Sequence, residues 1–171
     1  MTIRNVVPDH VFRDVIGRFA SGVTVITTTA DDGDHGTTAS AVSSLSMDPP
    51  MLLICLNRTS DTRAAILRSG VFGVNILAEH QGAIAAAFAR KGADKFAGVD
   101  ILRGSTGVPL VDDALAHLEC EVHETTTGGT HTVFLARVRV ASRLAPSRSN
   151  ASTAAASDSD APSSSPASRH D

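Results

Sequence analysis

The chain has 171 residues and a formal net charge of −3. That length predicts one domain with room for a buried core. Because the net charge is mildly acidic and Lys and Arg are scattered, nothing points to a nucleic acid or an anionic membrane as a partner. No apolar run approaches the roughly 18 residues of a membrane helix. Residues 1–10 lack the apolar segment of a secretory signal, so we expect a cytoplasmic protein.

The first element in chain order is an expected helix, with Asp9 after Pro8 as its N-cap. Its apolar residues recur at helical spacing and are Val11, Phe12, Val15, Ile16 and Phe19. The β-branched run 23–29 then predicts a strand. Residues 31–36 are interpreted as a turn, so a hairpin partner is expected from Thr37.

Short strands and helices follow. Strands are predicted at 51–56, 71–77, 116–122 and 132–140, and helices at 60–69 and 79–89. Strands lie beside strands without regular βα alternation. This favours a mainly antiparallel β-barrel with two or three short helices over a doubly wound sheet.

The last part of the chain differs in composition from the rest. From Pro146 onward there is no Leu, Ile, Val, Phe or Met, so no packing can offset the entropy cost of ordering the chain. We therefore expect a domain at 1–144 and a disordered tail at 145–171. Within the domain, Cys55 and Cys120 lie far apart in apolar runs and are expected to be buried free thiols, which fits a reducing compartment.

A charged strand face offers the first candidate site. Its side chains alternate with apolar ones and are His117, Glu119, Glu121 and His123. They could ligate a metal, but nothing else completes a coordination set, so we expect a solvated outer face and no metal. The chain also lacks the glycine-rich fingerprints of Rossmann and P-loop nucleotide sites.

A run of small hydroxyl residues at 36–46 is a second candidate. Small side chains let a flat ligand approach the backbone, whose N–H and C=O groups can pair with a ring edge. An edge strand of ordinary polar residues explains the same pattern, and the residues alone leave both interpretations open.

Two further segments suit a phosphate. Residues 57–63 lie at a strand end and open a helix, where free N–H groups attract anions, although Thr59 or Ser60 could simply be an N-cap. Asp61 would oppose a phosphate if it pointed inward. Residues 88–98 supply three cations and two aromatic rings, which could clamp phosphate and shield a ring or form a solvated loop.

The ordered set of segments resembles the short-chain flavin reductase family, the reductase components of two-component flavin monooxygenases. The order and spacing are kept over roughly residues 11–140. The matching segments are 12–13, 19–25, 38–40, 44–50, 57–62, 72–77, 94–98, 107–110, 118–120, His131 and 134–138.

The resemblance implies a Greek-key split β-barrel, the FMN-binding split barrel, that works as a homodimer. It also implies roles for individual residues. The isoalloxazine edge would meet Thr38, Ala39, Ser40 and Ala41. The ribityl phosphate would lie along Asn57, Ser60 and Thr62. The flavin site would be closed, near the subunit interface, by Arg90, Lys95 and Phe96.

The resemblance places His131 beside the nicotinamide, but the chain departs from the family in two places. The family's turn reads Gly-Asp-His, whereas this chain has Gly129-Thr130-His131 and so lacks the acid. Family members also run on to another strand after the equivalent of Val138, where this chain offers only residues 141–144 before the tail.

The resemblance therefore implies an NAD(P)H:flavin oxidoreductase. NADH or NADPH would pass a hydride from nicotinamide C4 to N5 of FMN or FAD, with no side chain acting as a general acid or base. Reduced flavin would then diffuse to a monooxygenase. The alternative is a non-catalytic flavin-binding protein, such as a carrier or a degenerate subunit. A third interpretation is a relative that transforms a small molecule on tightly held FMN.

Overall fold

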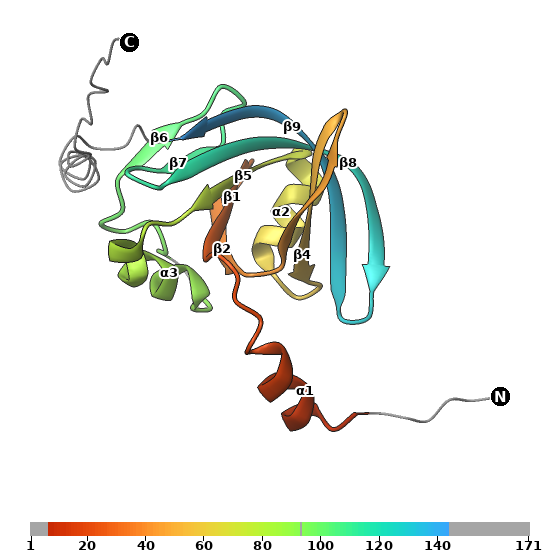
Figure 1. Ribbon diagram of the computed structural model, residues 1–171. Helices are drawn as coiled ribbons and strands as arrows, with labels where there is room; N and C mark the ends of the chain where they lie inside the picture. Colours follow the sequence, from red (N-terminus) through yellow and green to blue (C-terminus); the bar gives the residue numbers. More distant parts are fainter. Residues whose placement is uncertain (1–6, 93, 144–171) are drawn as a thin grey trace, which may run out of the picture.

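The structure is a computed structural model that describes residues 7–92 and 94–143 (Figure 1). The predicted tail, 145–171, lies outside the described residues. Seven strands form one antiparallel sheet in the order β2-β1-β5-β8-β9-β4-β3. They are β1 (Thr24–Ala30), β2 (Gly33–Ala39), β3 (Val42–Met47), β4 (Pro50–Asn57), β5 (Val71–Ile76), β8 (Ala116–Gly128) and β9 (His131–Arg143).

The sheet curls round without closing, so β2 and β3 are its two edges (Figure 1). A separate two-stranded sheet contains β6 (Ile101–Arg103) and β7 (Pro109–Val111). The helices of the described part are α1 (Asp9–Ile16), α2 (Asp61–Ser69), α3 (Gly82–Ala89) and a 3-10 turn, η1 (Glu79–Gln81). The predicted mainly β class with short helices is confirmed.

Helix α2 shows why local sequence signals worked well here. The Ser60 hydroxyl accepts a hydrogen bond from the backbone N–H of Arg63 at 3.4 Å and caps the helix. Gly70 ends it with a φ of 73°, a left-handed conformation that favours glycine, and its N–H bonds to the carbonyl of Ile66. The helix predicted at 60–69 therefore lies where we expected it.

Three sequence predictions need correction near the N-terminus and in the first hairpin. Pro8 is the N-cap of α1, so Asp9 is a helical residue, and the helix ends before Phe19. Strand β2 begins at Gly33, not at Thr37, because Gly33 has a φ of 115° and permits a tight turn after Ala30. The interpretation of 31–36 as a turn was therefore too long.

The solvated face predicted on β8 holds for Glu121 and His123, which are exposed, but is wrong for Glu119, which is only 4% exposed. Leu118, Cys120 and Val122 still face the core, so the alternation itself is kept. Glu119 is buried because Ser105 and Thr106, from the loop between β6 and β7, hydrogen-bond to its carboxylate and cover it.

Two hydrophobic clusters pack on opposite sides of β1. Ile26 belongs to the larger cluster, which includes Ile66 of α2 and the edge-to-face pair of Phe72 and Phe134. Val25 belongs to the smaller one, which contains Phe88 of α3. Because successive strand residues point to opposite faces, β1 is covered on both sides and holds α2 and α3 in fixed positions.

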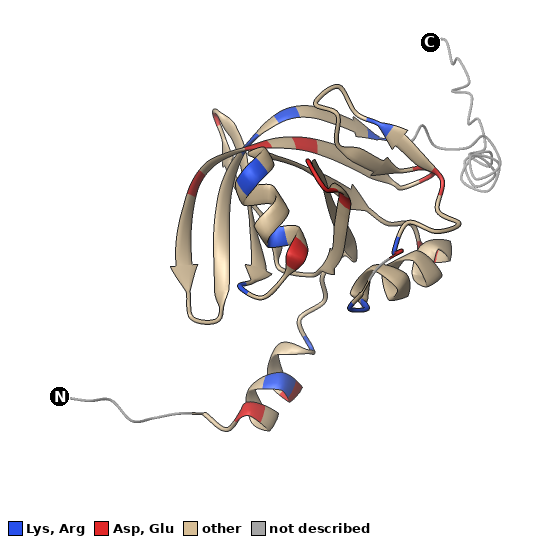
Figure 2. Cartoon of the chain, turned by 180° about the vertical axis from the view of Figure 1, so that it is seen from behind, with Lys and Arg blue, Asp and Glu red and all other residues tan. Residues whose placement is uncertain are grey.

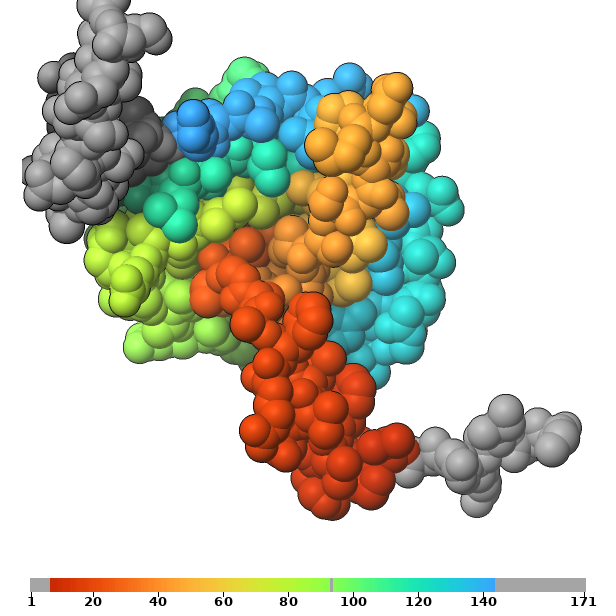
Figure 3. All heavy atoms as spheres, in the orientation of Figure 1, coloured from red at the N-terminus to blue at the C-terminus, as the bar shows by residue number. Residues whose placement is uncertain are grey.

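Helix α1 is the exception to this packing. It buries none of its residues and stands away from the body of the molecule (Figures 1 and 3). Its apolar residues and those of the following connector are 41% to 77% exposed, and they are Val11, Phe12, Val15, Ile16, Phe19 and Val23. None of the helices in the described part is long and apolar enough to cross a membrane.

The charge distribution agrees with the sequence prediction, and so does Cys120, but Cys55 is less buried than predicted. Positive and negative residues are interspersed over the elements and do not collect on one face (Figure 2). Both cysteines are free thiols, with Cys120 buried and Cys55 half-buried. Burial, with a smaller contribution from neighbouring Glu119, raises the pKa of the Cys120 thiol to about 12, so this thiol is uncharged at neutral pH.

Candidate active site

A cavity of about 250 Å³ lies between the ends of β2 and β4, the start of α2 and the start of β9. It brings together seven of the residues predicted from the sequence. Its lining residues are Thr37, Thr38, Ala39, Ser40, Ala41, Cys55, Leu56, Asn57, Ser60 and His131. Candidate residues from four segments of the chain therefore line one cavity, which we call the smaller cavity.

The β2 side of the smaller cavity is an open strand edge. In the described part of the chain β2 pairs only with β1, so its outward N–H and C=O groups have no strand partner. The Thr38 hydroxyl donates to the carbonyl of Ala85 at 2.6 Å and so ties β2 to α3. The hydroxyl proton of Thr38 is therefore engaged within the protein, and its oxygen can only accept a hydrogen bond from a ligand.

The opposite side is the junction of β4 and α2. The Asn57 side-chain carbonyl accepts from the backbone N–H and the hydroxyl of Thr59, each at 2.9 Å. Ser60 lines the cavity and also caps α2, so the cap and the candidate ligand residue are one side chain. The first N–H groups of α2 lie beside it and form a favourable place for a negative charge.

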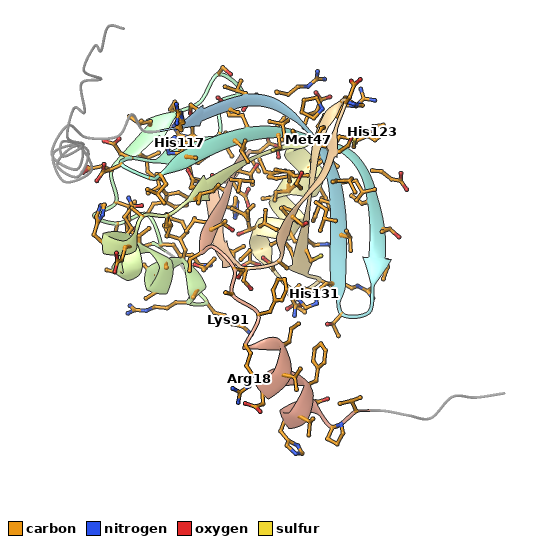
Figure 4. The ribbon with its side chains drawn as sticks, viewed as in Figure 1. Arg18, Met47, Lys91, His117, His123 and His131 are labelled. Carbon is orange, nitrogen blue, oxygen red and sulfur yellow. The ribbon has the colours of Figure 1, made fainter. Side chains whose placement is uncertain are left out.

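His131 lines the same cavity. It pairs with Asn57 across β4 and β9, and its Nδ1 lies 3.0 Å from the hydroxyl of Thr130. Nε2 is therefore the ring nitrogen left for a ligand. Figure 4 shows His131 at the end of β9 that faces α1, whereas His123 lies near the middle of β8, away from α1.

Arg63 links the two sides of this region. Its Nε donates to the hydroxyl of Thr132 at 3.0 Å, which joins α2 to β9 one residue from His131. The bond fixes the helix start against the histidine. Arg63 stood in a segment that the sequence singled out, but its role depends on a contact between residues 69 positions apart.

A second cavity, of about 500 Å³, adjoins the first and is called the larger cavity. It holds three other predicted residues, Thr62, Lys95 and Phe96. The remaining lining residues are Asp32, Asp34, His35, Gly36, Asp61, Ala64, Arg68, Gly92 and Asp94. Neighbouring residues of β2 and of α2 line the two cavities, so these elements separate them.

Lys95 and Phe96 are held firmly against β2. The Lys95 ammonium donates to the carbonyls of Gly36 at 3.0 Å and Phe88 at 3.4 Å. Burial lowers the pKa of Lys95, and the charge of Asp61 opposes that shift. The ring of Phe96 packs edge to face on Phe88, with centroids 4.9 Å apart.

Gly36 makes this close packing possible. A Cβ atom at this position would lie 2.3 Å from the ring of Phe88, so only glycine fits between β2 and α3. The structure does not bring every predicted residue to a cavity: Arg90 is exposed at the end of α3 and lines neither one.

Three lining residues of the smaller cavity were missed from the sequence. Thr37 belonged to the hydroxyl run and could have been included on that signal. Cys55 and Leu56 were interpreted only as core residues of a strand. Among the described residues, no group of three or more His, Cys, Asp or Glu side chains is placed to hold a metal ion.

Comparisons with known proteins agree with this site. A family profile described as "Flavin reductase like domain" matches residues 16–151. The chain belongs to this family. It is 48% identical, over 74% of its length and 68% of the relative, to the reductase component of a 4-nitrophenol 4-monooxygenase/4-nitrocatechol 2-monooxygenase from Rhodococcus opacus. It is 41% identical, over 78% and 68%, to the HsaB reductase subunit of a flavin-dependent monooxygenase from Rhodococcus jostii.

Solved structures of the family share the fold. A homologue of nitrilotriacetate monooxygenase component B from Mycobacterium thermoresistibile is 40% identical, with a TM-score of 0.78 over 81% of this chain and 77% of that one. The NADH:FAD oxidoreductase of Streptomyces globisporus is 37% identical, with a TM-score of 0.76 over 82% and 87%, and was also solved with NAD and FAD fragments. The predicted split barrel is confirmed.

Proposed function

We propose that this chain is an NAD(P)H:flavin oxidoreductase that reduces FMN or FAD by hydride transfer. The observation that carries the proposal is the smaller cavity, where the open edge of β2, the start of α2 and His131 meet. Each of these three features suits a different portion of the flavin or the nicotinamide. We assign the ring edge to β2, the flavin phosphate to α2 and the nicotinamide to His131.

The residues present fit a flavin on chemical grounds. The isoalloxazine is flat and has donors and acceptors along one edge, and residues 38–41 offer small side chains at a sheet edge that has no further strand partner in the described part of the chain. The carbonyls of Ala39, Ser40 and Ala41 already accept hydrogen bonds within the protein, so backbone N–H groups are the ones left for a ligand. A phosphate at the start of α2 would meet free N–H groups near Ser60 and Thr62. The Lys95 ammonium, with two of its three protons on carbonyls, keeps one proton for that phosphate.

A bound flavin supplies the hydride acceptor, and the chain's own residues bind and orient the reactants. Ser40 and Ala41 hold the ring edge, and Asn57 lies along the ribityl chain. His131 Nε2 would bind the carboxamide of the nicotinamide. The smaller cavity contains no carboxylate, and hydride transfer between the two cofactors requires no side chain to act as a general acid.

We extend the proposal to assembly and location. The exposed apolar face of α1 and its connector supports a homodimer, since a second copy would remove these side chains from water. The two free thiols support a reducing cytoplasm. The names of the Rhodococcus relatives support delivery of reduced flavin to a monooxygenase.

Aerobic turnover separates this function from a flavin carrier. The purified protein is mixed with NADH or NADPH, and nucleotide oxidation is followed with and without added FMN or FAD. We expect oxidation that depends on both protein and flavin, and the Streptomyces globisporus relative supports NADH as the first donor to test. A protein that binds flavin but oxidises neither nucleotide is a carrier.

A further inference from the structure

His131 lies at the very end of a strand. It is the first residue of β9 and follows a turn in which Gly129 has a φ of 59° (Figure 4). Its partner across β4 is Asn57, which is the last residue of that strand. Strand ends beside turns open more readily than strand centres. The position of His131 therefore depends on contacts that hold this end of β9 in place.

Two hydrogen bonds from the β4–α2 junction hold the residues on either side of His131. The backbone N–H of Arg58 donates to the carbonyl of Thr130 at 3.0 Å. The Nε of Arg63 donates to the hydroxyl of Thr132, also at 3.0 Å. The first bond uses only backbone groups, so almost any residue could make it. The second bond requires two particular side chains, Arg63 and Thr132.

The bond from Arg63 reaches β9 on the face opposite His131. Successive residues of a strand point to opposite faces. Thr132 is only 6% exposed and lies on the same face as the core residues Phe134 and Ala136. Arg63 itself lines neither cavity. Arg63 therefore holds the strand from within the barrel and leaves the space beside His131 to a ligand.

The contact between Arg63 and Thr132 fixes a direction and neutralises no charge. Among the residues that the structure describes, Arg63 makes no ion pair, and the hydroxyl that it meets is neutral. The bond joins the start of α2, where we assign the flavin phosphate, to the strand that carries His131. It thus helps to set the distance between the two bound cofactors. Hydride transfer is sensitive to that distance, because donor and acceptor must lie almost in contact.

We propose that Arg63, acting through Thr132, is a positioning residue that holds His131 where it binds the nicotinamide. The inference rests on the proposed function. Arg63 contacts neither cofactor, and its effect on NAD(P)H passes through Thr132 and the end of β9. Loss of the bond lets this end of the strand move and weakens the contact with the nicotinamide. The ring edge of the flavin stays on β2, which the bond does not touch.

Thr132→Val tests the proposal, since valine keeps the branched shape and removes the acceptor. With FMN saturating, it should raise the KM for NAD(P)H about three- to fivefold, the effect of one lost hydrogen bond. The dissociation constant of riboflavin, measured by titration, should not change. Arg63→Gln should act in the same way from the other side of the bond, whereas Thr132→Ser keeps the hydroxyl and should keep the wild-type KM. Arg139→Gln is the control, because Arg139 is exposed farther along β9 and lines neither cavity.

Double variants separate positioning from a general loss of structure. In His131→Ala, the addition of Thr132→Val should not raise the KM further, because the bond acts through a side chain that is already absent. Arg63→Gln combined with Thr132→Val should match either single variant. A further rise in either double variant, or a wild-type KM in Thr132→Val, would overturn the positioning role and leave the proposed function intact. A wild-type protein that oxidises neither NADH nor NADPH with added flavin would overturn the proposed function, and this inference with it.

Discussion

His131 is the residue whose role can be separated most cleanly from flavin binding. It lines the smaller cavity with Nε2 left for a ligand, while the residues that we assign to the flavin lie on β2 and at the start of α2. His131→Ala should raise the KM for NAD(P)H about three- to tenfold, the effect of one lost neutral hydrogen bond. Flavin affinity, measured by titration, should change little.

His123→Ala is the control for this variant, because His123 is exposed on β8 and lines neither cavity. It should leave KM, kcat and flavin affinity unchanged. If His131→Ala keeps the wild-type KM for NAD(P)H, His131 does not bind the nicotinamide.

Glu119 is a residue that the sequence placed on the surface and the structure places inside. Its carboxylate accepts from the backbone N–H of Thr106 at 2.7 Å and of Ser105 at 3.1 Å, and from both hydroxyls. Gly104 leaves it space, since a Cβ there would lie 2.6 Å from the carboxyl carbon. Glu119 therefore fixes the loop between β6 and β7.

The pKa of Glu119 gives a pH-dependent prediction. Burial opposes ionisation, but the hydrogen bonds from Thr106 and Ser105 outweigh it and hold the pKa below the usual 4.5. A depressed carboxyl pKa adds stability that is complete above the unfolded pKa and is lost as the pH falls through the folded one. Glu119→Gln should cost about 1–3 kcal/mol at pH 7, and less at acid pH.

Thermal melts of both proteins from neutral to acid pH would measure this difference. Glu121→Gln is the control, because Glu121 is exposed and makes a surface ion pair with Arg139 that is worth little. A deficit in Glu119→Gln that stays constant with pH would show that the carboxylate charge is not what holds the loop.

Among the elements, α1 is the one whose apolar residues are all left exposed by the rest of the described chain. Its apolar side chains are exposed in the single chain. Burying them in a dimer would remove the free-energy cost of keeping this apolar surface in water. Phe12→Asp with Val15→Asp should shift the protein from dimer to monomer in sedimentation at equal concentration. Asp14→Asn, on the polar side of α1, should leave the dimer unchanged. A wild-type monomer would contradict the assignment.

The elements also show how much could be predicted from the sequence. Helix α2 was predictable because its cap at Ser60 and its stop at Gly70 are local signals. Strand β2 was placed too late because the run Gly33-Asp34-His35-Gly36 has low strand propensity, and pairing with β1 overrides it. Glu119 was predicted to be exposed because Ser105 and Thr106, which cover it, lie 14 and 13 positions away and leave no signal in the alternation of residue types on β8.

The candidate active site also has parts that local sequence signals predict and parts that depend on long-range contacts. The hydroxyl run and the β4–α2 junction were recognised because their residue types suit a flavin locally. The bond from Thr38 to Ala85 and the bond from Arg63 to Thr132 join residues 47 and 69 positions apart. Such contacts arise only when the chain is folded, so the sequence could not reveal which hydroxyl is taken and which backbone is free.

At the scale of the whole molecule, we propose that residues 145–171 are dispensable for the barrel. Their composition offers no large apolar side chain to pack. A chain ending at Ala145 should keep the melting temperature, the sedimentation behaviour and the flavin affinity of the full protein. Aggregation or loss of flavin would show that the tail covers a sheet edge and that the domain boundary is wrong.

The central claim is that the molecule passes a hydride from a nicotinamide to a flavin. Anaerobic titration tests it most directly: NADH or NADPH is added to the protein with oxidised FMN or FAD, and the visible flavin absorption is followed. The account predicts that the absorption bleaches far faster than without protein, with one nucleotide consumed per flavin. Bleaching no faster than the protein-free rate, for either nucleotide and either flavin, would contradict it.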